Sequence, residues 1–334
     1  MKRCSLIFLT FMAMGLAAPP TYKVVDRIKI GGANRWDYAY MDSAAHRLYV
    51  SHAVQVEVID TATDKLVGTI TGTNGVHGIA VAADLGRGFI SDGADNDVTI
   101  FDLKTLAVIS KVKSGQNPDA IIYEPLSKRV YTFNGRSKDA TAIDAKTGDV
   151  IAMSIPLGGK PEFAQVNGKG QIFVNNEDTS EVMQIDAKDA LVAGRYSIAP
   201  CVNPSGLAID PKGRLYSVCS NKMMVISDPV SRKVLGTAEI GLGSDGVAFD
   251  DGYVFSSNGA DGTITVVGET APGKFENLAT IPSQRSGRTI AADPIAHKLY
   301  LPVAEFGAAP EEKDGKKGRP AMLPDSFSVL VMSR

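Results

Sequence analysis

The feature that most constrains this chain is a unit of about forty residues that recurs seven times. Successive units begin 40 to 43 residues apart. The opening runs are, in chain order, WDYAYM at Trp36, HGIAVA at His77, DAIIYE at Asp119, EFAQVN at Glu162, SGLAID at Ser205, DGVAFD at Asp245 and RTIAAD at Arg288. A period of this length is typical of a protein built from repeated supersecondary units.

Each unit contains further short runs that read as strands. A second run such as RLYVSH follows the first, and a third such as VEVID often ends in Asp. The runs are rich in β-branched and aromatic residues and are bounded by turn residues, with no helical periodicity. The 33 glycines and 17 prolines of the chain suit many tight turns. The stretch 204–236 therefore predicts four strands in an antiparallel meander.

A repeated four-stranded meander of this size predicts a β-propeller blade, because seven sheets around an axis bury one another's faces. The last unit stops after its third run, 326–332. The N-terminal run 23–30 is similar to the fourth run of the first unit. We expect it to complete the seventh blade and to close the ring, giving a single all-β domain over residues 22–334. Six blades plus a separate hairpin is the alternative.

The N-terminus has the pattern of a secretory signal peptide. Lys2 and Arg3 precede an apolar run, 6–16, and small residues follow it. We expect cleavage after Ala17, which removes residues 1–17; an uncut segment would instead anchor the chain in a membrane. Export implies an oxidising compartment, where the two remaining cysteines, Cys201 and Cys219, are predicted to form a disulfide. Two redox-active thiols are the alternative, although the pair lacks C-x-x-C spacing.

Several stretches resemble one family of exported bacterial proteins. The runs RLYVSH, VYTFNG and VMQIDAKDALV are similar to the YVTN-type repeats of the YncE family, and NKMMVISD, SSNGADGTITVV and LPVAEFG resemble its C-terminal half. The resemblance covers nearly all of the chain after residue 17. It implies a seven-bladed propeller that is periplasmic or secreted. It supplies no catalytic motif, because the family has no agreed one.

Two rings of loop residues are candidates for a site. The loops into the innermost strands and the loops between second and third strands lie on the same face, since strands alternate in direction. The first ring comprises Asp37, His77, Asp119, Glu162, Ser205, Asp245 and Arg288. The second ring comprises His52, Asp92, Asn134, Asn176, Cys219, Asn258 and Val303. We expect the first ring and the second-ring residues His52, Asn134, Asn176 and Asn258 to line an axial rim.

The chemistry of these rings allows several interpretations. Four of the seven first-ring residues are acidic, and converging carboxylates and amide oxygens suit Ca²⁺ or another divalent cation. They also suit a cationic or polyhydroxylated ligand. Alternatively, the acids cap turns or face water in the channel. His52 and His77 are either a pair that binds a transition metal or two unrelated loop histidines, because no third ligand is evident.

Other polar features have structural interpretations. The aspartates that end third strands precede turns, and their repetition favours turn stabilisation; they are Asp60, Asp102, Asp144, Asp186 and Asp228. The stretch 92–97, DGADND, lacks the bidentate Glu of a calcium loop and is interpreted as a hairpin. The insertion 305–325 in blade seven is a lid, a docking arm or a plain long loop. Arg285 and Arg288 near its base either bind an anion or pair with Glu305.

These observations favour a binding protein over an enzyme. The formal net charge of −2 does not favour nucleic acid as a partner, and no catalytic triad or phosphate-binding loop stands out. No segment after residue 17 is apolar enough to span a membrane. We expect a module that binds a small molecule or a periplasmic protein through its axial face. The alternative is a lactonase-like hydrolase with a divalent cation at the axial mouth. A third hypothesis, a partner of periplasmic oxidoreductases, rests on fold analogy.

Overall fold

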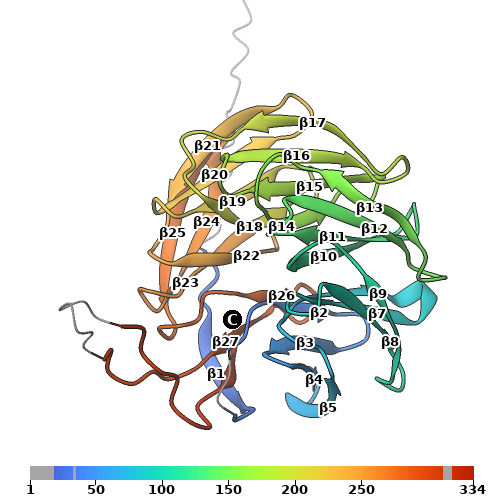
Figure 1. Cartoon of the computed structure of the whole chain (residues 1–334). Helices are drawn as coiled ribbons and strands as arrows, with labels where there is room; N and C mark the ends of the chain where they lie inside the picture. Colours follow the sequence, from blue (N-terminus) through green and yellow to red (C-terminus); the bar gives the residue numbers. More distant parts are fainter. Residues whose placement is uncertain (1–18, 33–34, 311–317) are drawn as a thin grey trace, which may run out of the picture.

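The regular structure is almost entirely β. The computed structural model describes residues 19–32, 35–310 and 318–334, and these ranges hold twenty-eight strands and a single turn of 3-10 helix, η1 (Ala83–Leu85). The strands form seven four-stranded antiparallel sheets, which are arranged in a ring (Figure 1). The chain is therefore a seven-bladed β-propeller, as the repeats predict. No helix among the described residues has the length and apolar character needed to cross a membrane.

The first four blades are built from consecutive strands. In each blade the strands are hydrogen-bonded in chain order, and the first strand is the innermost. Blades 1 and 2 comprise β2 (Ala39–Asp42), β3 (Arg47–His52), β4 (Gln55–Asp60), β5 (Lys65–Thr71), β6 (Val76–Ala82), β7 (Arg87–Asp92), β8 (Asp97–Asp102) and β9 (Val108–Lys113). Blades 3 and 4 comprise β10 (Pro118–Glu124), β11 (Arg129–Asn134), β12 (Asp139–Asp144), β13 (Val150–Pro156), β14 (Pro161–Val166), β15 (Gln171–Asn176), β16 (Glu181–Asp186) and β17 (Leu191–Ser197).

The last three blades follow the same plan until the ring closes. Blades 5 and 6 comprise β18 (Pro204–Ile209), β19 (Leu215–Cys219), β20 (Met223–Asp228), β21 (Lys233–Glu239), β22 (Ser244–Asp250), β23 (Tyr253–Asn258), β24 (Thr263–Ala271) and β25 (Lys274–Pro282). Blade 7 combines both ends of the chain, in the order β26 (Ala291–Asp293), β27 (Lys298–Val303), β28 (Ser328–Ser333) and β1 (Lys23–Lys29).

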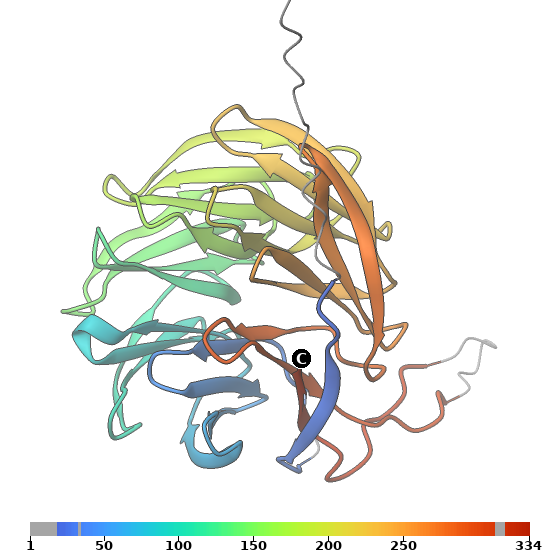
Figure 2. The same ribbon diagram turned by 180° about the vertical axis from the view of Figure 1, so that it is seen from behind.

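Closure by the N-terminal strand is as predicted. β1 pairs antiparallel with β28, with Ile28 opposite Val329, and Figure 2 shows this blue strand running beside the red ones. Both ends of the chain are also tied to blade 6. The Tyr22 hydroxyl donates to Asp250 at 2.9 Å, and a guanidinium nitrogen of Arg334 lies 3.4 Å from the same carboxylate. Pairing removes the open edge that β28 would otherwise present.

The core lies between neighbouring blades. The second and third strands of each blade are buried on both faces, whereas the outermost strands are largely exposed. At the junction of blades 1 and 2, for example, Tyr49 and Val58 pack with Ile90 and Phe101. Burial on both faces explains why the second and third runs are nearly continuous β-branched and aromatic sequence rather than alternating.

The aspartates at the ends of third strands stabilise turns, as predicted. The Asp60 carboxylate accepts from the backbone N–H groups of Ala62 and Thr63, both at 3.0 Å. Equivalent bonds occur at Asp102, Asp144, Asp186 and Asp228. In the stretch 92–97, Lys111 lies between the carboxylates of Asp92, Asp95 and Asp97. A lysine there is consistent with a hairpin rather than a calcium loop.

The predicted disulfide is present. Cys201 and Cys219 are bonded, and both side chains are buried. The bond joins the loop before β18 to the end of β19. The predicted signal peptide, residues 1–17, lies outside the described residues, as does the middle of the insertion 305–325. The described ends of that insertion meet in a bridge between Phe306 and Met322.

Candidate functional site

A β-bulge in the innermost strand sets the direction of most first-ring side chains. In blades 2 to 6, the pairing between the first and second strands shifts register across the ring residue, as between Val76 and Ile79 around His77. Such β-bulges redirect a side chain and are common beside functional sites. In blades 1 and 7 the ring residues Asp37 and Arg288 instead precede β2 and β26.

Hydroxyl and amide groups in the second strands hold the backbone of this rim. The Ser91 hydroxyl donates to the carbonyl of Asp119 in the next blade, and Ser257 donates to that of Arg288. Asn175 likewise donates to the Ser205 carbonyl at 3.0 Å. These positions were missed in the sequence. In the sequence, each of these three is a small polar residue in an otherwise apolar run, directly before a second-ring residue. A polar residue buried in this way indicates a hydrogen-bond partner nearby.

The first ring converges in the structure. The nearest group consists of Asp37, His77 and Asp119, from blades 1, 2 and 3. The imidazole Nδ1 of His77 lies 2.7 Å from Asp37 Oδ2 and 3.7 Å from Asp119 Oδ1. One ligand atom from each residue lies within 4.8 Å of the others. Two carboxylates and an imidazole at this separation form a possible metal-ligand set.

Arg288 of blade 7 links ring residues of the two neighbouring blades. Its guanidinium donates to Asp37 Oδ1 at 3.0 Å and to the backbone carbonyl of Trp36 at 3.1 Å, and it also pairs with Asp245 of blade 6. The sequence suggested that Arg288 either binds an anion or pairs with Glu305. In the structure it binds two carboxylates of the protein itself, those of Asp37 and Asp245. No pairing of Arg288 with Glu305 occurs among the described residues.

Blade 4 contributes a second ion pair. Lys160 Nζ lies 2.7 Å from Glu162 Oε1 and 2.5 Å from Glu177 Oε2. Ser205 of blade 5 makes no such pair; its hydroxyl donates to the Asp245 carbonyl at 3.2 Å. The axial cluster, defined as the first ring together with Lys160, thus contains four carboxylates and two permanent cations.

Burial shifts the pKa values of three carboxyl groups in the axial cluster. Burial, followed by the charge of Asp37, raises the pKa of Asp119 to about 6. Burial also raises the pKa of Glu162 to about 8, with the charge of Asp119 as the next cause. Burial raises the pKa of Asp245 as well, although Arg288 opposes this. Burial therefore outweighs the neighbouring cations at these three carboxyl groups.

His77 and Asp37 shift in the direction of an ion pair. Burial by itself would lower the pKa of His77, but its hydrogen bond to Asp37 and the charge of Asp119 raise it above the ordinary value. Burial by itself would raise the pKa of Asp37, but His77 and Arg288 together lower it. Both shifts favour an imidazolium that faces a carboxylate.

Two aromatic rings from opposite blades meet next to the cluster. Tyr38, which follows Asp37, lies 4.3 Å from Phe163 of blade 4, measured between ring centroids. The five equivalent positions are small: Gly78, Ala120, Gly206, Gly246 and Thr289. The Tyr38 hydroxyl is buried and has no hydrogen-bond partner among the described residues. Because blades 1 and 4 lie across the ring from each other (Figure 1), this contact spans the axis, and burial together with the nearby charges of Asp119 and Glu162 raises the pKa of Tyr38.

Among the described residues, no side chain of the second ring forms a hydrogen bond or an ion pair with a side chain of the axial cluster. Its polar members bond within their blades or to the loop leading into them. The Nδ1 of His52 lies 3.0 Å from Glu57, and Asn134 and Asn258 donate to Thr141 and Thr265. Asn176 donates to the Leu157 carbonyl at 3.0 Å. His52 and His77 therefore have separate partners.

The described ends of the insertion contact the rim from outside. Phe306 lies 6.2 Å from the Trp36 ring, and Trp36 stacks on Phe327 at 5.2 Å, both measured between centroids. Trp36 is also the residue whose carbonyl accepts from Arg288. The base of the insertion is thus in contact with a residue that borders the axial cluster.

Comparison with known proteins identifies the fold. No protein-family model matches the chain, and no curated protein does. Among solved structures, Kuenenia stuttgartiensis hydrazine synthase matches with a TM-score of 0.70 at 15% identity, covering 82% of this chain and 94% of that one. The Cps50 (Swd1) β-propeller domain of Myceliophteria thermophila matches with a TM-score of 0.69 at 11% identity, covering 83% and 96%. The likeness is that of a β-propeller. At these identities it carries no function.

Proposed function

We propose that this protein is an exported, YncE-like propeller that binds a small ligand at its axial mouth. Support for export comes from the disulfide, which is typical of an oxidising compartment. Support for the ligand site comes from the axial cluster, to which all seven blades contribute a side chain. The observation that carries the proposal is the group formed by Asp37, His77 and Asp119 within a cluster of carboxyl groups.

The ligand that best suits these groups is a divalent cation, alone or carried by a small molecule. The raised pKa values of Asp119 and Glu162 favour the protonated carboxyl groups. A cation bound beside them would favour the ionised carboxylates instead. An imidazole with two carboxylates suits Zn²⁺ or Mn²⁺ better than Ca²⁺, which takes oxygen ligands. Binding requires the His77 Nδ1 to exchange its hydrogen bond with Asp37 for the metal.

The test is metal binding measured by thermal shift and calorimetry on metal-stripped protein. We expect Zn²⁺ or Mn²⁺ to raise the melting temperature and chelator to reverse the effect. The variants H77N and D119N should lose the response. H46N is the matched control, because His46 is exposed in a turn away from the cluster. A response that H77N retains, or no response to Zn²⁺, Mn²⁺ or Ca²⁺, would refute the proposal.

A second candidate function is metal-dependent hydrolysis of a lactone. It is favoured by the number of protein ligands: three leave coordination positions open, as in catalytic rather than structural metal sites. A bound cation there would polarise a carbonyl and activate water. The measurement is acid release from a simple γ-lactone by metal-loaded protein, and a rate equal to that of H77N would exclude this activity.

A further inference from the structure

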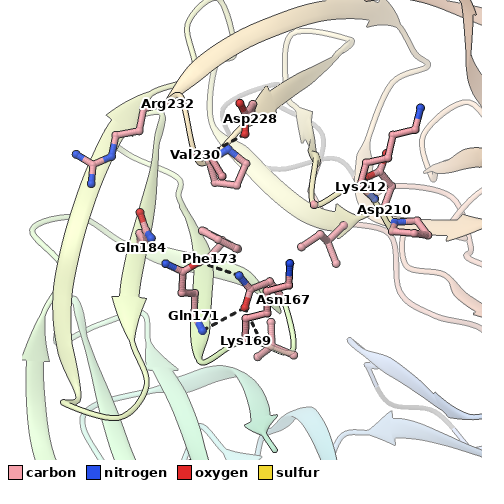
Figure 3. Close-up of a pocket in the computed structure, with 15 residues that line it drawn as sticks. Asn167, Lys169, Gln171, Phe173, Gln184, Asp210, Lys212, Asp228, Val230 and Arg232 are labelled. Atoms are coloured by element: carbon pink, nitrogen blue, oxygen red, sulfur yellow. Dashed lines mark hydrogen bonds between the residues drawn. The ribbon is translucent and has the colours of Figure 1, made fainter. Parts of the chain in front are cut away.

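A pocket opens between blades 4 and 5 on the face opposite the axial mouth. It lies among the turns that follow the first and third strands, and its volume is about 470 Å³. Figure 3 shows its walls: Asn167, Lys169 and Gln171 come from blade 4, and Asp210 and Lys212 come from blade 5. This volume lies within the range of small-molecule sites. The axial cluster takes no part in it.

Three other blade junctions show one way in which this space is filled. At the junction of blades 3 and 4, Arg129 donates to the carbonyl groups of Ala187 and Lys188 at 3.0 and 2.6 Å. The Tyr131 hydroxyl donates to the same Ala187 carbonyl at 2.6 Å. Lys298 and Tyr300 reach the corresponding turn of blade 1, and Arg87 reaches that of blade 3. A basic residue at the start of the second strand therefore closes these junctions.

Blade 4 lacks both of these donors. Gln171 stands where blade 3 has Arg129, and Phe173 stands where it has Tyr131. The carbonyl groups they would reach belong to Pro229 and Val230 in blade 5. Within the described residues, neither carbonyl accepts a hydrogen bond. The shorter amide side chain and the missing hydroxyl leave the space open.

The carbonyl group of Gly213 also lacks a hydrogen-bond donor, because Pro229 stands where other blades supply an N–H group. In blade 4, the residue after the third-strand aspartate, Ala187, donates its N–H to the Gly170 carbonyl at 3.0 Å. Blades 1, 2 and 3 have the same bond. In blade 5 this residue is Pro229, which has no N–H. The carbonyl of Gly213, which also borders the pocket, consequently lacks this partner.

The remaining polar lining carries charges of both signs, and the Asp228 carboxylate accepts from backbone N–H groups of its own turn. The Oε1 of Gln171 accepts from Asn167 at 2.8 Å, which leaves its NH₂ group for a ligand. Lys169 and Lys212 are exposed on opposite walls, whereas Arg232 extends away from the pocket (Figure 3). Lys169 forms no ion pair among the described residues, and Lys212 Nζ lies 3.5 Å from the Glu269 carboxylate. The Asp210 carboxylate is already bonded to backbone N–H groups and to Arg214. The pocket thus offers acceptors at its blade 5 wall and positive charge at its rim.

We propose that this pocket binds an acidic saccharide. Sugar hydroxyl groups donate to carbonyl oxygens, in place of the arginine and tyrosine found at the junction of blades 3 and 4. A uronic carboxylate accepts from Lys169, or from Lys212 in exchange for its surface contact with Glu269. A free cationic ligand would also supply donors, but the two lysines would repel it. The ligand class therefore follows from unpaired carbonyl groups inside and ammonium groups at the rim.

The test compares digalacturonate with neutral galactobiose by calorimetry and by NMR line shifts. We expect the acidic disaccharide to bind at least tenfold more tightly. The double variant Q171R/F173Y rebuilds the closed junction of blades 3 and 4, so it should lose binding and melt at a higher temperature than the wild type. Equal binding of both sugars, or binding of neither, would overturn the proposal.

Two further variants make the outcome independent of the axial site. H77N changes only the axial mouth and should bind digalacturonate as the wild type does. K169M/K212M keeps the pocket but removes its positive rim, and it should bind the acidic disaccharide no better than the neutral one. Unchanged binding in K169M/K212M would contradict the assignment, even if Q171R/F173Y failed to fold.

Discussion

At the scale of single residues, Arg288 neutralises two carboxylates that come from different blades. Asp37 belongs to blade 1 and Asp245 to blade 6, so the guanidinium links both sides of blade 7. A charge with several hydrogen bonds to carboxylates is costly to delete, because its partners stay behind unpaired. Arg288 is therefore expected to stabilise the ring as well as the site.

Replacing Arg288 tests this role. R288M should lower the free energy of unfolding by about 1–2 kcal/mol, less than for a fully buried pair because the side chain is partly exposed to solvent. R285M is the matched control, since Arg285 is exposed and forms no ion pair among the described residues. Urea denaturation of both variants is the measurement, and equal losses would contradict the assigned role.

The pH dependence of stability follows from the raised pKa values. Glu162 has a folded pKa of about 8, so between its ordinary pKa and pH 8 the folded chain binds more protons than the unfolded chain. Stability contributed by this group is therefore lost as the pH rises through that window. The raised pKa values of Asp119 and His77 act in the same direction.

The variant E162Q should remove part of this dependence. The substituted amide cannot ionise but can still accept from Lys160, so the variant should be more stable than the wild type at pH 8, on the order of 2 kcal/mol. Near pH 4, where Glu162 is protonated in both states, the two proteins should unfold alike. Urea denaturation at both pH values is the measurement, and parallel pH profiles would show that Glu162 is not the source.

At the scale of elements, the innermost strands approach one another closely around the axis. Gly206 and Gly246 each directly follow a ring residue, Ser205 and Asp245. The backbone of the next blade lies beside each glycine. A Cβ on Gly206 would come within 2.7 Å of the Asp245 carbonyl oxygen. Small residues at these positions allow the first strands to meet, which brings the ring side chains together.

This packing predicts the effect of an added methyl group. G206A should destabilise the protein by about 1–3 kcal/mol, because the group it would strike is backbone and cannot rotate away. G135A is the control, since the nearest atom to its Cβ would be at an ordinary 3.4 Å. Thermal denaturation of both variants decides between them, and a G206A protein as stable as G135A would contradict the close approach.

At the scale of the whole molecule, the seventh blade depends on a strand from the other end of the chain. Without β1, the strand β28 would be an exposed edge beside an exposed apolar core. A variant that lacks residues 1–29 should therefore aggregate or unfold at a lower temperature. A variant that lacks residues 1–21 keeps β1 and Tyr22 and should remain monodisperse. Size-exclusion chromatography of both distinguishes edge closure from a general effect of truncation.

Much of the architecture was predictable because it is written in local, repeated patterns. The pattern of strands and turns depends on residues that are close in the sequence, and it recurs along the chain. Because the repeats share this pattern, an assignment made in one repeat supports the same assignment in the others. The closing strand 23–30 was found in the same way and differs from β1 by one residue. The pairing of Cys201 with Cys219 needed the repeat alignment as well, which places both on one face.

The sequence by itself determined which residues begin the innermost strands, and hence that Asp37, His77, Asp119, Glu162, Asp245 and Arg288 share a ring. Only the tertiary structure decided their chemistry, because charge pairing and burial depend on which side chains from distant repeats come within a few ångströms. It also separated the second ring from the cluster, since its side chains bond within their blades. The open junction between blades 4 and 5 has the same origin. Gln171, Phe173 and Pro229 are ordinary residues in the sequence, and their missing donors matter only where another blade needs them.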